Sequence, residues 1–140
     1  MTELRFRQIE TTADMGMLAW GRSEKALFEN AAAGLSHIIA GPGCARGTEI
    51  RFARAEGIDS PARLVAWLSE WLYLFDSQGF VGRSFRIEEM GGEVVAGRGW
   101  GELHDPARHD LLCGVKGITY HQLEIRRQGG RLRARVILDV

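Results

Sequence analysis

Apolar and polar residues alternate along much of the chain, and this period of two predicts β-strands. Together with a short apolar run, the alternation predicts seven strands, at residues 5–9, 17–20, 48–55, 80–88, 93–103, 111–127 and 131–140. Glycine occupies every second position from Gly97 to Gly101. Such spacing inside a strand predicts a kink or a bulge, because glycine weakens regular pairing and allows close backbone approach.

Two segments between the strands have apolar residues at helical spacing instead. In the first, Ser23 is expected to cap the helix N-terminus and Gly41-Pro42-Gly43 to end the helix. The second is expected to begin at Ser60-Pro61, which supplies a cap and a proline at the first helical position, and to end before Gly79. Its apolar face is wide enough to predict the most buried element of the fold; this face comprises Leu64, Val65, Trp67, Leu68, Trp71, Leu72, Leu74 and Phe75.

The last two predicted strands flank Gly129-Gly130, which is a signal for a two-residue hairpin turn. In that register Glu124 faces Arg135, Ile125 faces Ala134 and Tyr120 faces Asp139, so apolar residues fall on one side of both strands. The buried face of the last strand is then expected to comprise Leu132, Ala134, Val136, Leu138 and Val140. Asp139 falls on the wetter side, together with Ile137 and the arginines of this strand.

No linker or repeat divides the 140 residues, so we expect one domain over residues 1–140. The fold class is predicted to be α+β, with a mostly antiparallel or mixed sheet packed with two amphipathic helices. Cys44 and Cys113 form no Cys-x-x-Cys pair, and no apolar run approaches the roughly 20 residues of a membrane helix. The first residues lack the apolar core of a signal peptide. We therefore expect a soluble cytoplasmic protein with no membrane contact.

The formal net charge is zero, so the composition gives no strong basic field for non-specific nucleic-acid binding. Sixteen of the eighteen basic residues are nevertheless arginine, and Lys25 and Lys116 are the two lysines. One explanation is codon bias in a genome rich in G and C. The other is a protein or phosphate interface that uses the forked donors of guanidinium groups.

The chain ends on an apolar strand, which places the Asp139 carboxylate beside the α-carboxylate of Val140. Chain ends of a domain often lie close together, so Asp14, in a loop near the N-terminus, could join them. Three carboxylates would form an all-oxygen site for Ca²⁺, Mg²⁺ or Mn²⁺. Alternatively, Asp14 forms a turn with its own loop and Asp139 pairs with a neighbouring arginine.

Histidine and aspartate also gather near residue 105, as His104, Asp105, His109 and Asp110, and His121 could add an imidazole. The five-residue interval around Pro106 matches no standard zinc arrangement. Asp105 before a proline more often caps a turn, so a structural loop or a partner-binding loop is the preferred interpretation. A small metal-dependent hydrolase with His109 or His121 as base is an alternative. The sequence contains no Gly-x-Ser-x-Gly elbow and no phosphate-binding loop motif, and Cys113 lies in an apolar context typical of a core cysteine.

Several ordered blocks along the whole chain resemble the archease family. The opening block, residues 10–16 (Glu-Thr-Thr-Ala-Asp-Met-Gly), is similar to the family's Glu-His-Thr-Ala-Asp-x-Gly. The other matching blocks are Trp20-Gly21, residues 28–32, 67–76, Gly101-Glu102, 105–109, 115–121 and 137–140. Thr11 stands where the family usually has histidine, Lys25 where an acidic residue is common, and Gly117 where alanine is usual.

The resemblance implies an accessory protein, not an enzyme, that assists the GTP-dependent tRNA-splicing RNA ligase of the RtcB type. It would promote guanylylation of the ligase and its multiple turnover. The resemblance implies an RNA contact that is indirect or undetermined. It also implies that Asp14, Asp139 and Val140 bind a divalent cation, Ca²⁺ or Mg²⁺, with Mn²⁺ also possible. A chaperone-like adaptor in which the metal only clips the chain end together is a further alternative.

Overall fold

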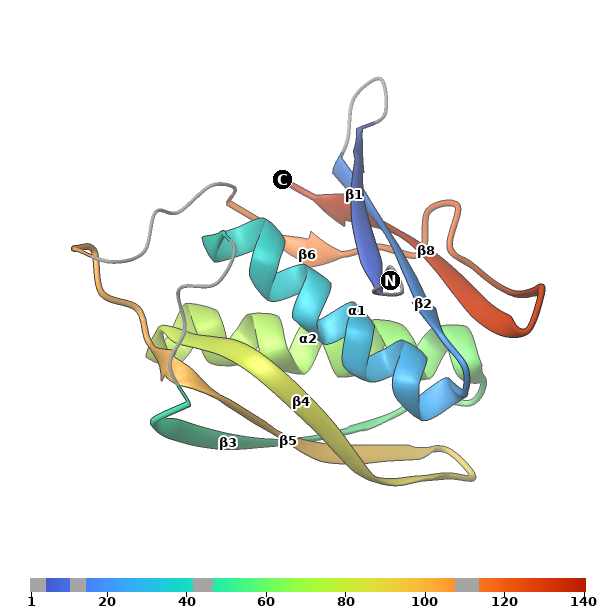
Figure 1. The fold of residues 1–140 in the computed structure, drawn as a ribbon, viewed down its shortest axis with the longest axis horizontal. Helices are drawn as coiled ribbons and strands as arrows, with labels where there is room; N and C mark the ends of the chain where they lie inside the picture. The colour runs from blue at the N-terminus through green and yellow to red at the C-terminus, as the bar shows by residue number, and fades with distance from the viewer. Residues whose placement is uncertain (1–4, 11–14, 42–46, 108–113) are drawn as a thin grey trace.

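The structure is a computed structural model that describes residues 5–10, 15–41, 47–107 and 114–140. Two helices, α1 (Glu24–Ala40) and α2 (Ser60–Gln78), lie between two antiparallel sheets (Figure 1). α1 packs against β2 of one sheet and β4 of the other, and α2 packs mainly against β3. This arrangement confirms the predicted α+β fold with two amphipathic helices. No helix in the described ranges is long and apolar enough to span a membrane.

The five-stranded sheet holds the strands from both ends of the chain, and we call it the terminal sheet. Its order is β1-β2-β8, and both β6 and β7 pair with the far side of β8. Its strands are β1 (Phe6–Glu10), β2 (Met15–Gly21), β6 (Gly117–Ile118), β7 (Glu124–Gln128) and β8 (Arg131–Asp139). The three-stranded sheet has the order β3-β5-β4, with β3 (Glu49–Glu56), β4 (Phe80–Gly91) and β5 (Val94–Leu103).

The ends of both helices follow from local side chains. The Ser23 hydroxyl accepts a hydrogen bond from the Ala26 N–H at 3.1 Å, and Gly41 ends α1 with a positive φ of 83°, as predicted. At the start of α2 the predicted cap is wrong, because the Asp59 carboxylate, not Ser60, accepts from the Ala62 N–H at 2.8 Å. Ser60 is the first helical residue and donates instead to Glu24 of α1 at 3.0 Å.

α1, not α2, is the more buried helix, which corrects the sequence prediction. Nine of its 17 residues are buried, against six of 19 in α2. α1 packs closely against β2 of the terminal sheet and β4 of the three-stranded sheet, whereas α2 packs mainly against β3 and leaves Tyr73 63% exposed. At Gly34 the helix approaches the terminal sheet so closely that an added Cβ would lie 2.5 Å from the Met17 sulfur and 3.0 Å from the Phe6 Cβ.

The glycine-rich segment of β5 was predicted to be kinked or bulged, but it pairs regularly with β3, and the irregularity lies in the facing strand β4. The β4–β5 register shifts between Gly82 and Ser84 and again between Ile87 and Glu89. A side chain at Gly101 would overlap the Val81 carbonyl, and one at Gly99 would meet the Trp71 ring at 2.9 Å. These glycines therefore let α2 and β4 pack closely on β5.

The hairpin register around Gly129-Gly130 is confirmed near the turn, where Glu124 pairs with Arg135 and Ile125 with Ala134. Farther from the turn the prediction fails, because the structure has two separate strands, β6 and β7, in place of one continuous strand. A turn intervenes, in which the Leu123 N–H donates to the Tyr120 carbonyl at 3.1 Å and Gln122 has a φ of 51°. Consequently Gly117, not Tyr120, faces Asp139.

Two positions of β8 differ from the predicted burial. Val140, expected on the buried face, is 44% exposed because it lies beyond the last paired residue. Ile137, expected on the wetter side, is 2% exposed. Gly16 pairs with Ile137, and a Cβ at Gly16 would meet both Ile9 and Ile137 within 3.1 Å. The two isoleucines thus cover a gap left by glycine on the outer side of the terminal sheet.

Candidate functional site

The end of β8 has a backbone fixed from both sides. Met15 of β2 pairs with Leu138 on one side, and Ile118 of β6 pairs with the same residue on the other. The Lys116 N–H donates to the Asp139 carbonyl at 2.6 Å, so the hydrogen bonding continues up to the penultimate residue. Asp139 and Val140 are both exposed. The structure therefore places two exposed residues with carboxylates at an ordered chain end.

Asp14, the third residue predicted to bind a cation, lies outside the described residues. The nearest described residue in the sequence is Met15, the register partner of Leu138, and Leu138 precedes Asp139. Among the described residues, which exclude Asp14, no three His, Cys, Asp or Glu side chains gather closely enough to hold a metal ion. The three-carboxylate site stays a prediction.

The space beside Asp139 is more open than predicted, because Gly117 rather than Tyr120 lies opposite it. Gly117 has no side chain at the paired position, and an added Cβ there would lie 4.0 Å from the Asp139 Cβ, an ordinary van der Waals contact. Tyr120 is 63% exposed and belongs to the turn that follows. Within that turn the Thr119 hydroxyl donates to the Ile137 carbonyl at 2.8 Å and accepts from the His121 N–H at 3.2 Å. The block of residues 115–121 thus supports the backbone next to Asp139.

His104 and Asp105 have structural roles in the loop after β5. The His104 N–H donates to the Gly79 carbonyl at 2.6 Å, and its ring meets Phe75 edge to face. The Asp105 carboxylate accepts from the Ala107 N–H at 3.0 Å, which is the predicted turn cap. The predictions for His109 and Asp110 fall outside the described residues. His121 is exposed and its backbone belongs to the turn beside β8.

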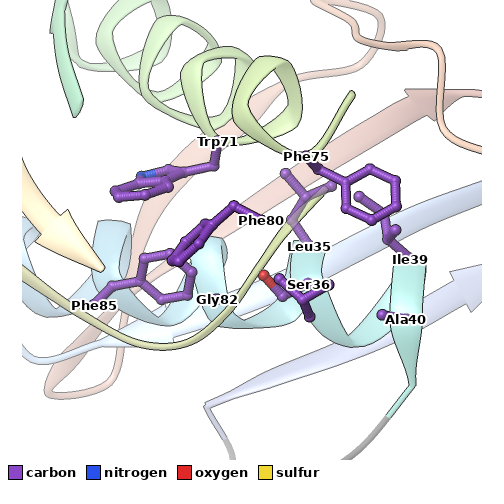
Figure 2. A pocket seen from close by; sticks show the side chains of 10 residues that line it. Leu35, Ser36, Ile39, Ala40, Trp71, Phe75, Phe80, Gly82 and Phe85 are labelled. Atoms are coloured by element: carbon purple, nitrogen blue, oxygen red, sulfur yellow. The ribbon is translucent and has the colours of Figure 1, made fainter. Parts of the chain in front are cut away.

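Figure 2 shows a pocket between α1, α2 and β4 that is lined mainly by apolar side chains. Its lining includes Trp71, Phe75, Phe80 and Phe85, and the one polar side chain among the lining residues is Ser36. Trp71 and Phe85 meet edge to face with ring centroids 4.9 Å apart. Because no acid, base or thiol lines it, this pocket offers no groups for metal binding or acid–base chemistry.

Three residues of the matching block 28–32 join elements of the fold. The Trp67 indole donates to the Phe28 carbonyl at 3.0 Å and ties α2 to α1. The Glu29 carboxylate accepts from the Ile87 N–H at 2.8 Å beside a bulge of β4, and the Asn30 amide donates to the Trp20 carbonyl at 2.6 Å. The sequence predicted that these residues lie on a helix. It could not predict their hydrogen-bond partners, which are 10 to 58 residues away along the chain.

An α+β domain with two helices between two antiparallel sheets fits one known class of small proteins. The model of the Archease protein family (MTH1598/TM1083) matches residues 6–140. The chain belongs to the archease family.

Relatives and solved structures agree with this assignment. Protein archease of Methanosarcina acetivorans is 34% identical, over 97% of this chain and 96% of the relative. Protein archease of Pyrococcus abyssi is 33% identical, over 97% of this chain and 99% of the relative. The solution structure of Methanobacterium thermoautotrophicum protein 1598 has a TM-score of 0.81 at 29% identity, covering 96% of this chain and 98% of that one. The crystal structure of a Thermotoga maritima archease, described as a possible chaperone, has a TM-score of 0.67 at 20% identity and covers both chains fully; this likeness supports the fold alone.

Proposed function

We propose that this protein is an accessory factor of a GTP-dependent tRNA-splicing RNA ligase of the RtcB type. It would promote guanylylation of the ligase and its multiple turnover by direct contact, without catalysing a reaction itself. The observation that carries the proposal is the family match over residues 6–140, which includes the chain end with Asp139 and Val140.

A divalent cation bound by Asp14, Asp139 and the Val140 carboxylate is part of this proposal. The residues described by the structure fit such an ion in their chemistry, because the Asp139 and Val140 carboxylates are adjacent, exposed oxygen donors on an ordered backbone. Ca²⁺ and Mg²⁺ prefer such ligands, and Mn²⁺ accepts them. When bound, the ion would supply positive charge for phosphate or carboxylate oxygens of the partner.

The proposal is tested by ligase–GMP formation with purified components. A cognate ligase is assayed with GTP, across Mg²⁺ and Mn²⁺ concentrations, with and without this protein. We expect stimulation by the wild type and a loss of at least about tenfold in Asp139→Asn, because the amide carries no charge for the cation. Asp76→Asn is the matched control, since Asp76 is an exposed carboxylate on α2 far along the chain from the site. Equal guanylylation with and without the wild-type protein would overturn the proposal.

A second candidate is a chaperone-like adaptor, which the description of the Thermotoga maritima structure as a possible chaperone favours. In that case the metal would hold the chain end in place and would have no ligase-specific effect. Protection of an unrelated aggregating protein, unaffected by Asp139→Asn, would support the adaptor. The ligase proposal expects no such general protection.

A further inference from the structure

The outer face of the terminal sheet carries a dense group of arginines. On β8, Ala134, Val136 and Leu138 point into the core and are fully buried, so Arg131, Arg133 and Arg135 alternate onto the opposite side. Arg126 of β7 pairs with Arg133, Arg7 of β1 pairs with Leu18, and the Arg5 carbonyl accepts from the Trp20 N–H. We call this surface the arginine face; it comprises Arg5, Arg7, Arg126, Arg131, Arg133 and Arg135.

Two apolar side chains of β2, Leu18 and Trp20, lie beneath these arginines. Leu18 and Trp20 are 8% and 7% exposed, yet neither belongs to the core cluster. They lie on the outer side of β2, where Leu18 pairs with Arg135 and Trp20 with Arg133. The Arg131 guanidinium lies 5.2 Å from the centre of the Trp20 ring. The aliphatic parts of the arginine side chains therefore cover Leu18 and Trp20, and this packing orients the guanidinium groups before any ligand binds.

In the described strands, few acids balance the positive charge of Arg5, Arg7, Arg126, Arg133 and Arg135. Glu124 of β7 lies among the arginines, and one oxygen of its carboxylate contacts both Arg126 at 2.7 Å and Arg133 at 3.0 Å. Arg135 donates to the neutral Gln122 side chain at 3.0 Å. Arg5 and Arg7 are exposed and have no ion-pair partner among the described residues.

The direct pairing of Arg126 with Arg133 also has a cost. Like charges directly opposite each other on neighbouring strands are destabilising. Glu124 partly offsets this repulsion, but a neutral residue at either position would remove it. The unfavourable arrangement in a chain of zero net charge is explained if an anion binds here.

We propose that the arginine face binds the phosphate backbone of single-stranded RNA. Alternate residues of β8 lie about 6.7 Å apart along the strand, which resembles the regular spacing of phosphates along an RNA strand. Guanidinium groups hold phosphate through paired hydrogen bonds. Trp20 is covered by Arg131 and offers no free ring for base stacking, so binding should not depend on base sequence. The choice of RNA over other polyanions rests on the proposed function.

The arginine face lies next to the proposed cation ligands at the end of β8. Asp139 lies on the same side of β8, four residues beyond Arg135 and about 13 Å farther along the strand. An RNA strand that follows the arginines would therefore run toward the proposed cation ligands. In this arrangement the accessory factor would hold the RNA near its ligase rather than contact the ligase alone.

The test measures binding of fluorescein-labelled single-stranded RNA by fluorescence anisotropy across a salt series, with no ligase present. The double variant Arg5→Gln/Arg7→Gln removes two exposed charges outside the Glu124 network. For every phosphate that the protein no longer neutralises, the affinity should fall roughly fivefold near 0.1 M salt, and the slope of log affinity against log salt should decrease by about 0.7. Polyuridine and polyadenine should bind alike.

The matched control is Arg83→Gln/Arg86→Gln on β4 of the three-stranded sheet. Both arginines are exposed and lack ion-pair partners in the described part of the chain, so the charge change is the same. The control should keep the wild-type affinity and slope. A further variant, Phe52→Ser, removes a ring that is 66% exposed on the three-stranded sheet and could stack on bases. Thermal unfolding of each variant checks that it is folded.

Three results would overturn the proposal. The first is the absence of RNA binding by the wild type at low salt. The second is an equal loss in both arginine double variants, or a loss only in Phe52→Ser, which would move the site to another surface. The third is displacement of RNA by polyglutamate at equal charge concentration, which would indicate an acidic protein partner. None of these outcomes depends on ligase stimulation, so the proposed function can fail or stand separately.

Discussion

Single residues at the end of β8 combine a fixed backbone with exposed oxygens. The Lys116 N–H holds the Asp139 carbonyl, while the Asp139 side chain and Val140 are exposed. A cation that needs several oxygens gains affinity when they are held in position before binding, because less ordering accompanies association. The free carboxylate of Val140 can serve as a ligand only if no residue follows it.

Adding one glycine after Val140 should therefore weaken divalent-cation binding by about tenfold or more, equivalent to ~1.4 kcal/mol. The added peptide bond removes the charged carboxylate from its position without touching the core, so the melting temperature without metal should stay the same. Isothermal titration with Ca²⁺ and with Mg²⁺ measures the affinity. Val140→Ala, which keeps the terminal carboxylate in place, is the control. Unchanged affinity in the extended chain would remove Val140 from the ligand set.

At the scale of elements, the contact between α1 and β2 depends on the absence of a side chain at Gly34. Gly34→Val should destabilise the protein by about 1–3 kcal/mol, because the new side chain would overlap Met17 and Phe6. Urea unfolding measures the change in free energy. Gly91→Val is the control, since nothing lies within 4 Å of a Cβ at Gly91, and a change within about 0.5 kcal/mol is expected there. Equal effects would show that α1 can move away from the sheet at little cost.

The start of α2 gives a second prediction at this scale. Asp59→Ala should cost about 1 kcal/mol of unfolding free energy, because the carboxylate accepts from the Ala62 N–H. Ser60→Ala, which removes a partly exposed hydrogen bond to Glu24, should cost no more than about 0.5 kcal/mol. Urea unfolding of the two variants under identical conditions compares them. A larger loss of unfolding free energy in Ser60→Ala than in Asp59→Ala would indicate that Ser60 caps the helix.

At the scale of the whole molecule, a cation at the chain end would stabilise the fold, because β8 pairs with β2, β6 and β7 and is central to the terminal sheet. A ligand at one hundred times its dissociation constant adds about 2.7 kcal/mol, which corresponds to a rise in melting temperature of roughly 10 °C for a domain of this size. Thermal unfolding with saturating Ca²⁺ and with chelator measures this rise. Asp139→Asn should abolish it and Asp76→Asn should retain it. The same rise in both variants would place the cation elsewhere.

The local features of the sequence determined most of the elements. The spacing of apolar residues located both helices and six of the seven predicted strands, while the described part of the segment 111–127 contains two short strands instead of one. Ser23 and Gly79 marked helix ends, and Gly129-Gly130 set the register of the nearest pairs. These succeeded because each depends on residues within a few positions of one another. The resemblance to the archease family, carried by short ordered blocks, is confirmed by the family match.

Only the tertiary structure decided those features that depend on contacts between residues far apart in the sequence. Gly117 rather than Tyr120 lies opposite Asp139, because a turn interrupts the strand. α1 is the more buried helix because it packs closely against both sheets, whereas α2 packs mainly against β3. The tertiary structure also brought arginines from β1, β7 and β8 onto one face, although the net charge of the chain is zero. Composition sums charge over the whole chain, whereas binding depends on where strand pairing places each charge.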